Sequence, residues 1–295
     1  LTTLLWLTPA GMGTAEGGRV GILGLVGISP QAAMAFSLTV RFIELSLVGA
    51  GLVYLSREGL LHMAGKGFAP GGLRERVRSA LGVVRGALEV GSLYVYGGLL
   101  RPWLPRIFAR RYRQPDPWAY ETSPYEQRKY DLKVQILPRR PDPGTPPYAR
   151  VLDLGCSEGL FTCRLAWEGV GKAVVGVDFV PAAIERARER GSSVPNVEFL
   201  LLDVTQELPS GPFDLVYCSE ILYYLGPTRR VKELADRVCE RLAPGGHVVL
   251  VSAWPAGKVI HRPFLRRREL VVVREHVEKD HSRPYVITCL ERVAR

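Results

Sequence analysis

In the second half of the chain, three aspartates and a glycine-rich loop have the residue types and spacing of a ligand-binding site. Asp153, Asp178 and Asp203 each follow a short apolar run, and the first opens the sequence Asp-Leu-Gly-Cys-Ser-Glu-Gly. Glycine lets the backbone approach a ligand closely, and a carboxylate at a strand end accepts hydrogen bonds from a nucleoside. The spacing therefore predicts a nucleoside site, with Asp178 at the ribose hydroxyls and Asp203 at an adenine amine.

Apolar runs of strand length alternate with helix-like segments around these aspartates. The expected strands are 150–154, 173–177, 197–202, 213–217 and 247–252, and the expected helices are 160–168, 181–190 and 231–242. Two more strands, 269–274 and 285–293, follow without a helix between them. This order is typical of a doubly wound α/β sheet, and the terminal strand pair predicts one antiparallel edge strand.

Two ligands are compatible with such a site, a dinucleotide and S-adenosylmethionine. A dinucleotide loop has the form G-x-G-x-x-G, whereas this chain has D-x-G-x-S-x-G. The loop resembles the D-x-G-x-G-x-G loop of class I methyltransferases, and Pro244-Gly-Gly246 also resembles that family. The resemblance covers about residues 114–295 and implies a Rossmann-like, seven-stranded methyltransferase sheet with an antiparallel terminal strand. It implies S-adenosylmethionine as cofactor, with the methionine end at Asp153, Gly155, Ser157 and Gly159, the ribose at Asp178, and the adenine at Asp203 and Val204.

A narrower resemblance, to the nodulation protein S (NodS) group, rests on three short motifs. They are Pro117-Trp118, Ser123-x-Tyr125-Glu126 and Ser219-Glu-Ile-Leu-Tyr-Tyr224. Members of that group N-methylate the free amine of a chitooligosaccharide precursor. The resemblance implies an N-terminal cap over residues 114–148, with a helix at 118–137 that turns Tyr125 and Lys129 inward. An ordinary surface helix is the alternative. Tyr125 and Ser219 join the expected cofactor contacts, and so does Phe179, which packs either on the adenine or in the core.

Methyl transfer to an amine needs a positioned acceptor and an unprotonated nitrogen. Glu220, just after the fourth strand, is our candidate base, and Tyr223 is expected beside the acceptor. The alternative for Glu220 is a first-turn carboxylate that stabilises a helix dipole. Among the histidines, we expect His247 to be structural, whereas His261 and His281 could touch substrate from loops. No metal is expected, because the five cysteines include no C-x-x-C pair.

The first third of the chain differs sharply in charge and hydropathy. Residues 1–56 are apolar with a net charge of zero, and 57–113 contain eleven Lys/Arg against three Asp/Glu. The run 31–55 is about 37 Å long as a helix, enough to span a bilayer, and Arg41 and Glu44 could pair on one face of it. A buried helix of a soluble protein is the alternative. Residues 57–113 are expected to be a basic juxtamembrane linker, either an amphipathic helix or a solvated segment.

The segments Pro9–Glu16, Gly27–Pro30 and Ala35–Arg41 resemble the end of the flippase-like membrane domain of lysylphosphatidylglycerol synthases. Since the chain begins at Leu1 without a basic signal-peptide start, we expect it to be cut from a longer reading frame. The sequence thus predicts a membrane-tethered methyltransferase at the cytoplasmic face of the inner (plasma) membrane. Its acceptor would be an amine or hydroxyl of a small molecule, glycan or lipid-linked intermediate.

Two other functions are weaker on the sequence. A membrane protein could use the last domain only as a nucleoside-binding regulator without turnover. A nucleic-acid methyltransferase is disfavoured, because base-amine methyltransferases resemble a (D/N)PP(Y/F) pattern after the fourth strand and this chain has Cys218-Ser-Glu-Ile221. We therefore expect no nucleic-acid partner, and the basic stretch lies outside the expected catalytic domain.

Overall fold

The computed structural model describes residues 14–25, 27–42, 97–98, 100–138, 147–226, 228–279 and 283–293. The chain divides into two compact units, Leu1–Ser92 and Leu93–Arg295. In the first unit, helix α1 covers Thr14–Leu25 and residues 30–42 are also helical, with the side chains of Leu25 and Phe42 exposed.

The predicted membrane span is only partly described. No helix within the described ranges is both long enough and apolar enough to cross a bilayer. Residues 43–55 of the expected span lie outside those ranges, and so does Glu44, the expected partner of Arg41. Residues 81–95 of the expected juxtamembrane linker lie outside them as well.

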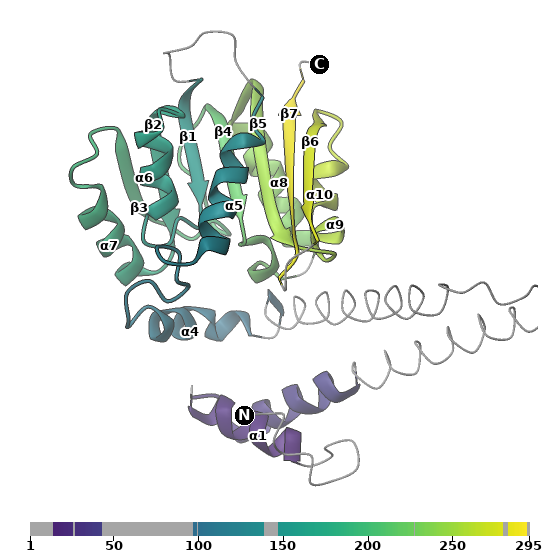
Figure 1. The fold of residues 1–295 in the computed structure, drawn as a ribbon. Helices are drawn as coiled ribbons and strands as arrows, with labels where there is room; N and C mark the ends of the chain where they lie inside the picture. Colours follow the sequence, from purple (N-terminus) through teal and green to yellow (C-terminus); the bar gives the residue numbers. More distant parts are fainter. Residues whose placement is uncertain are drawn as a thin grey trace, which may run out of the picture. The chain divides into compact units, whose positions relative to one another are not determined.

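The second unit is built on a mixed sheet that has seven strands within the described residues (Figure 1). The strands are β1 (Tyr148–Leu154), β2 (Gly171–Asp178), β3 (Val197–Leu201), β4 (Phe213–Ser219), β5 (Leu242–Ala253), β6 (Leu270–Glu278) and β7 (Tyr285–Arg292). Their order in the sheet is β3-β2-β1-β4-β5-β7-β6. Strands β1 to β5 pair in parallel, and β7 is antiparallel to both of its neighbours. The predicted α/β fold with an antiparallel terminal strand is confirmed.

One detail of the sheet prediction is wrong, because the antiparallel strand does not lie at the edge. Strand β7 lies between β5 and β6, and residues 285–290 are buried. Strand β6 forms the edge, and its Val271 and Val272 are exposed. A strand buried along most of its length needs a neighbour on each side, so β7 takes the inner place.

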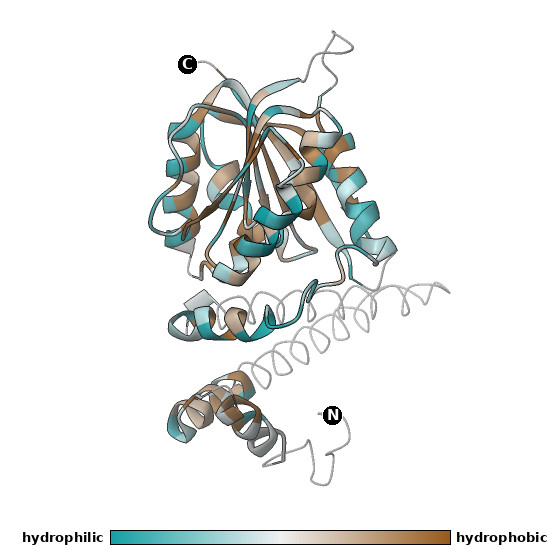
Figure 2. Cartoon of the chain, turned by 90° about the vertical axis from the view of Figure 1, so that its left-hand side faces the viewer, coloured by the Kyte–Doolittle hydropathy of each residue, from teal (hydrophilic) through white to brown (hydrophobic). Residues whose placement is uncertain are grey.

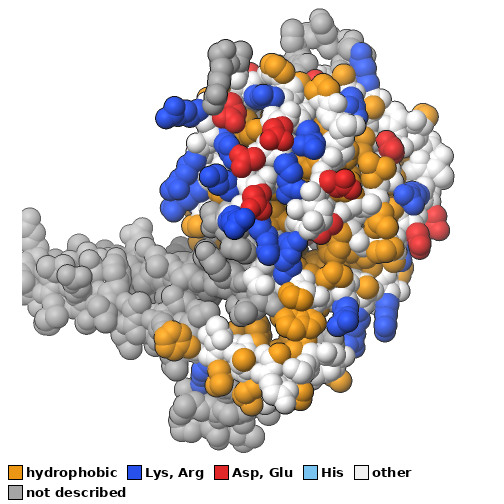
Figure 3. Space-filling model, turned by 180° about the vertical axis from the view of Figure 1, so that it is seen from behind, with side chains coloured by type: hydrophobic (Ala, Val, Ile, Leu, Met, Phe, Trp, Pro, Cys, Tyr) orange, Lys and Arg blue, Asp and Glu red, His pale blue; other side chains and the backbone are white. Residues whose placement is uncertain are grey.

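Helices cover both faces of this sheet. On one face lie α5 (Pro124–Gln135), α6 (Leu160–Trp167) and α7 (Pro181–Gly191), and on the other lie α8 (Thr228–Arg241) and α10 (Arg262–Leu265) (Figure 1). The strands are the most hydrophobic part of the unit, and the helices are mixed in hydropathy (Figure 2). Figure 3, the view from behind, shows basic and acidic side chains intermixed on the upper part of the surface. On α8, Arg229 and Glu233 form an ion pair at 2.9 Å. The short helices α9 (Gly257–Ile260) and α10 were not predicted.

The predicted domain boundary between residues 113 and 114 falls inside the second unit. Helix α4 (Leu104–Arg111) follows the 3-10 turn Arg101–Trp103 and belongs to the unit that begins at Leu93. Its apolar side places Leu104, Phe108 and the following Tyr112 toward the protein, while Arg106 and Arg110 are exposed. An amphipathic pattern does not by itself distinguish a membrane surface from a protein surface, and the apolar side of α4 packs on the protein.

Candidate active site

The glycine-rich loop follows β1 at the carboxyl end of the sheet, and its backbone conformation explains its residue types. Gly155, Ser157 and Gly159 all have positive φ, at 76°, 53° and 76°. A Cβ atom on Gly155 would overlap Ile221, and one on Gly159 would lie 2.7 Å from the ring of Phe199. The loop therefore needs glycine at both positions for conformation and for space. Ser157 holds a conformation that is uncommon for a side-chain-bearing residue, as is frequent at functional sites.

Asp178 lies beside this loop, as the sequence predicted. Its Oδ2 accepts a hydrogen bond from the amide of Ser157 and its Oδ1 one from the amide of Val180, both at 3.0 Å. Burial raises the pKa of Asp178 to about 6, against the lowering effect of these backbone hydrogen bonds. The backbone of Phe179 also stabilises the ionised carboxylate. A carboxylate has about four lone-pair sites, so acceptor capacity remains for a ligand. Asp178 is thus a buried, oriented acceptor.

The two other aspartates differ in their surroundings. Asp153 is buried and accepts a hydrogen bond from Thr162 Oγ1 at 2.7 Å, and burial raises its pKa. Asp203 is exposed and accepts one from the amide of Thr205 at 2.8 Å. Because the Leu202 amide donates to the Asp178 carbonyl, Asp203 follows directly beside the end of β2, and Val204 next to it is half-buried.

Aromatic side chains cover this end of the sheet, and two of them, Phe108 and Tyr112, were not singled out from the sequence. Phe108 of α4 makes edge-to-face contacts with Phe179 at 5.3 Å and with Tyr224 at 5.0 Å between ring centroids. The Tyr112 hydroxyl donates to Ser157 Oγ at 2.7 Å and accepts from the indole N–H of Trp118 at 3.2 Å. Burial raises the pKa of Tyr112, which keeps this hydroxyl protonated. Residues 108–118 therefore close over the loop and Phe179.

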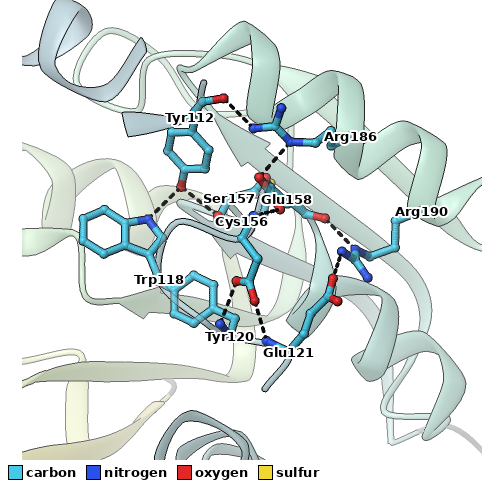
Figure 4. Close-up of polar contacts among 10 residues, drawn as sticks. Tyr112, Trp118, Tyr120, Glu121, Cys156, Ser157, Glu158, Arg186 and Arg190 are labelled. Carbon is cyan, nitrogen blue, oxygen red and sulfur yellow. Dashed lines mark hydrogen bonds and ion pairs between the residues drawn. The ribbon is translucent and has the colours of Figure 1, made fainter. Parts of the chain in front are cut away.

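Glu158 joins this cover to the loop and to α7 (Figure 4). Its carboxylate accepts from Arg186 Nε at 2.7 Å and from the amide of Asp116 at 2.9 Å, and its carbonyl accepts from Arg190 Nε at 3.0 Å. Arg186 also donates to the carbonyl of Tyr112 at 2.8 Å. The sequence analysis missed this role, although Glu158 lies inside the loop motif and Arg186 and Arg190 lie one helical turn apart.

The residues expected at the acceptor form a second group, at the end of β4. Glu220 has a φ of 59°, and its amide donates to the Val251 carbonyl at 2.9 Å. Its Oε1 lies 3.3 Å from Lys129 Nζ, and its Oε2 accepts from the Tyr223 hydroxyl at 2.7 Å. Burial and Glu220 raise the pKa of Tyr223. The carboxylate thus binds two side chains instead of a helix N-terminus, while its role as a base stays a prediction.

Helix α5 presents a charged face to the protein interior, and Lys129 lies on it as predicted. Glu126, Lys129 and Lys133 are all buried, at a spacing of three and four residues. Lys133 Nζ lies 3.3 Å from Ser219 Oγ and 3.3 Å from the centroid of the Phe161 ring, and burial lowers its pKa to about 7. The helix is shorter than the predicted 118–137.

Tyr125, the other residue expected to turn inward, is half-buried and contacts residues at the start of β7. Its hydroxyl donates to the carbonyl of Arg283 at 2.8 Å, and its ring lies 5.6 Å from that of Tyr285. None of these contacts belongs to the predicted nucleoside residues. The assignments of Tyr125 and Ser219 to the cofactor therefore stay predictions.

Comparison with known families identifies this arrangement. The model of the family "Nodulation protein S (NodS)" matches residues 106–261, more than half of the chain. The chain belongs to the NodS family. The match begins within α4, so the family segment includes Phe108 and Tyr112 and starts before the predicted boundary at residue 114.

Curated relatives and a solved structure agree with that membership. The chain is 33% identical to nodulation protein S of Rhizobium tropici over 148 residues, which cover 50% of this chain and 59% of the relative. It is 40% identical to trans-aconitate 2-methyltransferase of Deinococcus radiodurans over 126 residues, 43% of each protein. The N-methyltransferase NodS from Bradyrhizobium japonicum WM9, solved with S-adenosyl-L-homocysteine, shares the fold with a TM-score of 0.56 and 24% identity. That alignment covers 64% of this chain and 97% of the solved one.

The three histidines of this NodS-family chain that the sequence analysis considered have different outcomes. His261 is buried, with its ring nitrogens 3.1 Å from Thr288 Oγ1 and Ser252 Oγ, and burial lowers its pKa to about 3. The predicted substrate contact of His261 is therefore wrong, because α9 and α10 pack this residue against the sheet. His247 is buried on β5 next to Tyr148, in keeping with a structural role, and His281 lies outside the described residues.

Proposed function

We propose that the second unit transfers a methyl group from S-adenosylmethionine to an amine of a small molecule, a glycan or a lipid-linked intermediate. The observation with the greatest weight is the buried Asp178 carboxylate, which the backbone amides of Ser157 and Val180 hold beside the glycine-rich loop with acceptor capacity left for a ligand. Membership of the NodS family supports the same reaction. The chain spans 59% of the Rhizobium tropici relative, so the activity of the whole protein is part of this proposal.

The residues present suit this cofactor. Asp178 offers acceptors for ribose hydroxyls, the loop brings backbone close to a ligand, and Asp153 is a buried carboxylate suited to a cationic group. S-adenosylmethionine supplies a methyl group already activated on a sulfonium. The protein then has to bind and orient the cofactor and the acceptor, and to exclude water from the site. Phe108 and Tyr112 exclude water above the loop, and Glu220 with Tyr223 holds the acceptor and receives a proton from it.

A binding titration tests the cofactor. S-adenosylhomocysteine should bind the full chain with micromolar affinity, NADH should not bind, and Asp178→Ala should lose S-adenosylhomocysteine binding. Radiolabelled methyl transfer to a glucosamine tetrasaccharide then tests the reaction, with its N-acetylated counterpart as control. An unchanged affinity in the Asp178→Ala variant would count against the cofactor site. Binding without turnover on either acceptor would count against methyl transfer to this amine.

We also propose that residues 1–113 attach the protein to the cytoplasmic face of the inner membrane. Two observations support this: the excess of basic residues in 57–113 and the exposed apolar side chains of Leu25, Leu38 and Phe42. The resemblance of residues 1–56 to a flippase-like domain belongs to the same proposal. Flotation with vesicles tests it. The full chain should float with vesicles that contain anionic lipid, and absence from the floating fraction would contradict the proposal.

A further inference from the structure

Three charged side chains meet where α5 crosses the end of β4. Lys129 Nζ lies 2.8 Å from Glu126 Oε2 and 3.3 Å from Glu220 Oε1. The side chains of Glu126 and Lys129 are 4% and 6% exposed, whereas that of Glu220 is 22% exposed. One buried ammonium thus lies between two carboxylates, and Glu220 is the member of the three that reaches solvent.

This group has an excess of one negative charge. Burial alone lowers the pKa of Lys129, but Glu220 and Glu126 raise it above its usual value, so the amine stays charged. Around Lys129 the other close groups are the rings of Tyr125 and Tyr285, at 4.9 and 5.8 Å from Nζ. Two carboxylates and one ammonium leave a charge of −1 in a place where burial makes unbalanced charge costly.

Two nearby cations, Arg283 and Lys133, offset this charge only in part. Arg283 lies 3.4 Å from Glu126 Oε1, but its side chain is 62% exposed, and water screens it. The Tyr223 hydroxyl donates to Glu220 without adding charge. Lys133, the next buried amine on α5, binds Ser219, and burial lowers its pKa to about 7. A bound cation would therefore be favourable at Glu220.

The backbone of Glu220 has an uncommon conformation. Its φ of 59° lies in the left-handed region, which side-chain-bearing residues other than Asn and Asp seldom adopt. The hydrogen bond from its amide to the Val251 carbonyl of β5 holds this conformation. Strain of this kind persists where the structure over-determines it, typically at binding and catalytic residues.

We propose that a cationic acceptor amine replaces the Lys129 ammonium as the partner of the Glu220 carboxylate. During this exchange, Glu126 keeps its ion pair with Lys129. The inference rests on the proposed function and adds a specificity device to it. Glu220 binds the acceptor, and Glu126 and Lys129 act through it as positioning residues. The excess carboxylate selects an ammonium over a neutral amide or hydroxyl, because the neutral group cannot take the place of Lys129.

A charge-swap series tests this exchange. Each protein is the full chain saturated with S-adenosylhomocysteine and titrated with a glucosamine tetrasaccharide or its N-acetylated counterpart. The wild type should bind the amine form more tightly. Glu126→Gln removes the excess charge and leaves Lys129 to Glu220 alone, so the Kd of the amine form should rise about tenfold. Adding Lys129→Met restores a charge of −1 and should restore the affinity, and Glu220→Gln should abolish the preference for the amine.

The double variant separates this role from a structural one. Two disruptive substitutions in a packed cluster would weaken binding further, whereas the charge argument expects a rescue. A double variant no better than Glu126→Gln would overturn the inference, and so would equal wild-type affinity for the two tetrasaccharides. If the double variant does not bind S-adenosylhomocysteine, the single variant Glu126→Gln, which keeps the side-chain shape, decides the test. An affinity of that variant for the amine form equal to the wild-type affinity would then overturn the inference. Failure of the wild type to bind S-adenosylhomocysteine would overturn the proposed function and the inference together.

Discussion

Asp178 should show its burial in two measurements at once, the pH dependence of stability and that of ligand binding. Folding raises the pKa of the Asp178 carboxyl from 3.8 to about 6, mainly because the group is buried. The difference corresponds to about 3 kcal/mol, because a tenfold change in proton affinity is worth about 1.4 kcal/mol. An unfolded chain releases this proton near pH 4, and the folded chain retains it until about pH 6. The folded state then binds more protons, so Asp178 lowers stability as pH rises through this window.

The Asp178→Asn variant keeps the side-chain shape and does not titrate. Denaturant unfolding of both full chains from pH 4 to 7 should show the wild type losing about 2 kcal/mol of this difference relative to the variant. Binding should change in the opposite direction, because the ribose needs the ionised carboxylate. Since about a tenth of Asp178 is ionised at pH 5, the wild-type Kd for S-adenosylhomocysteine should be about tenfold higher at pH 5 than at pH 7. A stability difference that does not vary with pH, or a wild-type Kd that stays flat, would refute the argument.

Three further substitutions test other parts of the site. Gly155→Ala should lower the free energy of unfolding by about 1 kcal/mol or more beyond the loss caused by the control Gly169→Ala. Both glycines have positive φ, but an added Cβ meets a neighbour only at Gly155. Equal losses in the two variants would contradict this. Lys133→Met should remove a pH dependence of the free energy of unfolding. Burial lowers the pKa of Lys133 to about 7 in the folded chain, so above pH 7 the unfolded chain binds more protons. The wild type should therefore gain stability relative to the variant as pH rises from 7 to 10. A constant difference would speak against a buried, neutralised amine. Glu158→Gln should destabilise the chain by about 1.5–3 kcal/mol, because it weakens the hydrogen bond to Arg186, and a loss below 0.5 kcal/mol would mean the contact is solvated.

The part of the site that the sequence predicted is local in the chain. Asp153, Gly155, Ser157 and Gly159 form one turn, and its residue types follow from backbone conformations that a short motif specifies. Asp178 and Asp203 were predicted near it because parallel strands bring their carboxyl ends to one edge. Strand and helix periods also determine the α/β alternation, since they depend on near neighbours only.

Contacts between distant segments were decided by the tertiary structure. Lys129 meets Glu220 across 91 positions in the sequence, and Tyr112 meets Ser157 across 45. Residues 104–111 were predicted as part of a juxtamembrane linker because of the basic charge of 57–113, whereas the structure forms helix α4 there and packs its apolar side on the protein. His261 was predicted at an open loop, but the packing of α9 and α10 buries it. Spacing along the chain specifies the turns and the strand ends, whereas burial and charge pairing depend on which segments fold against one another.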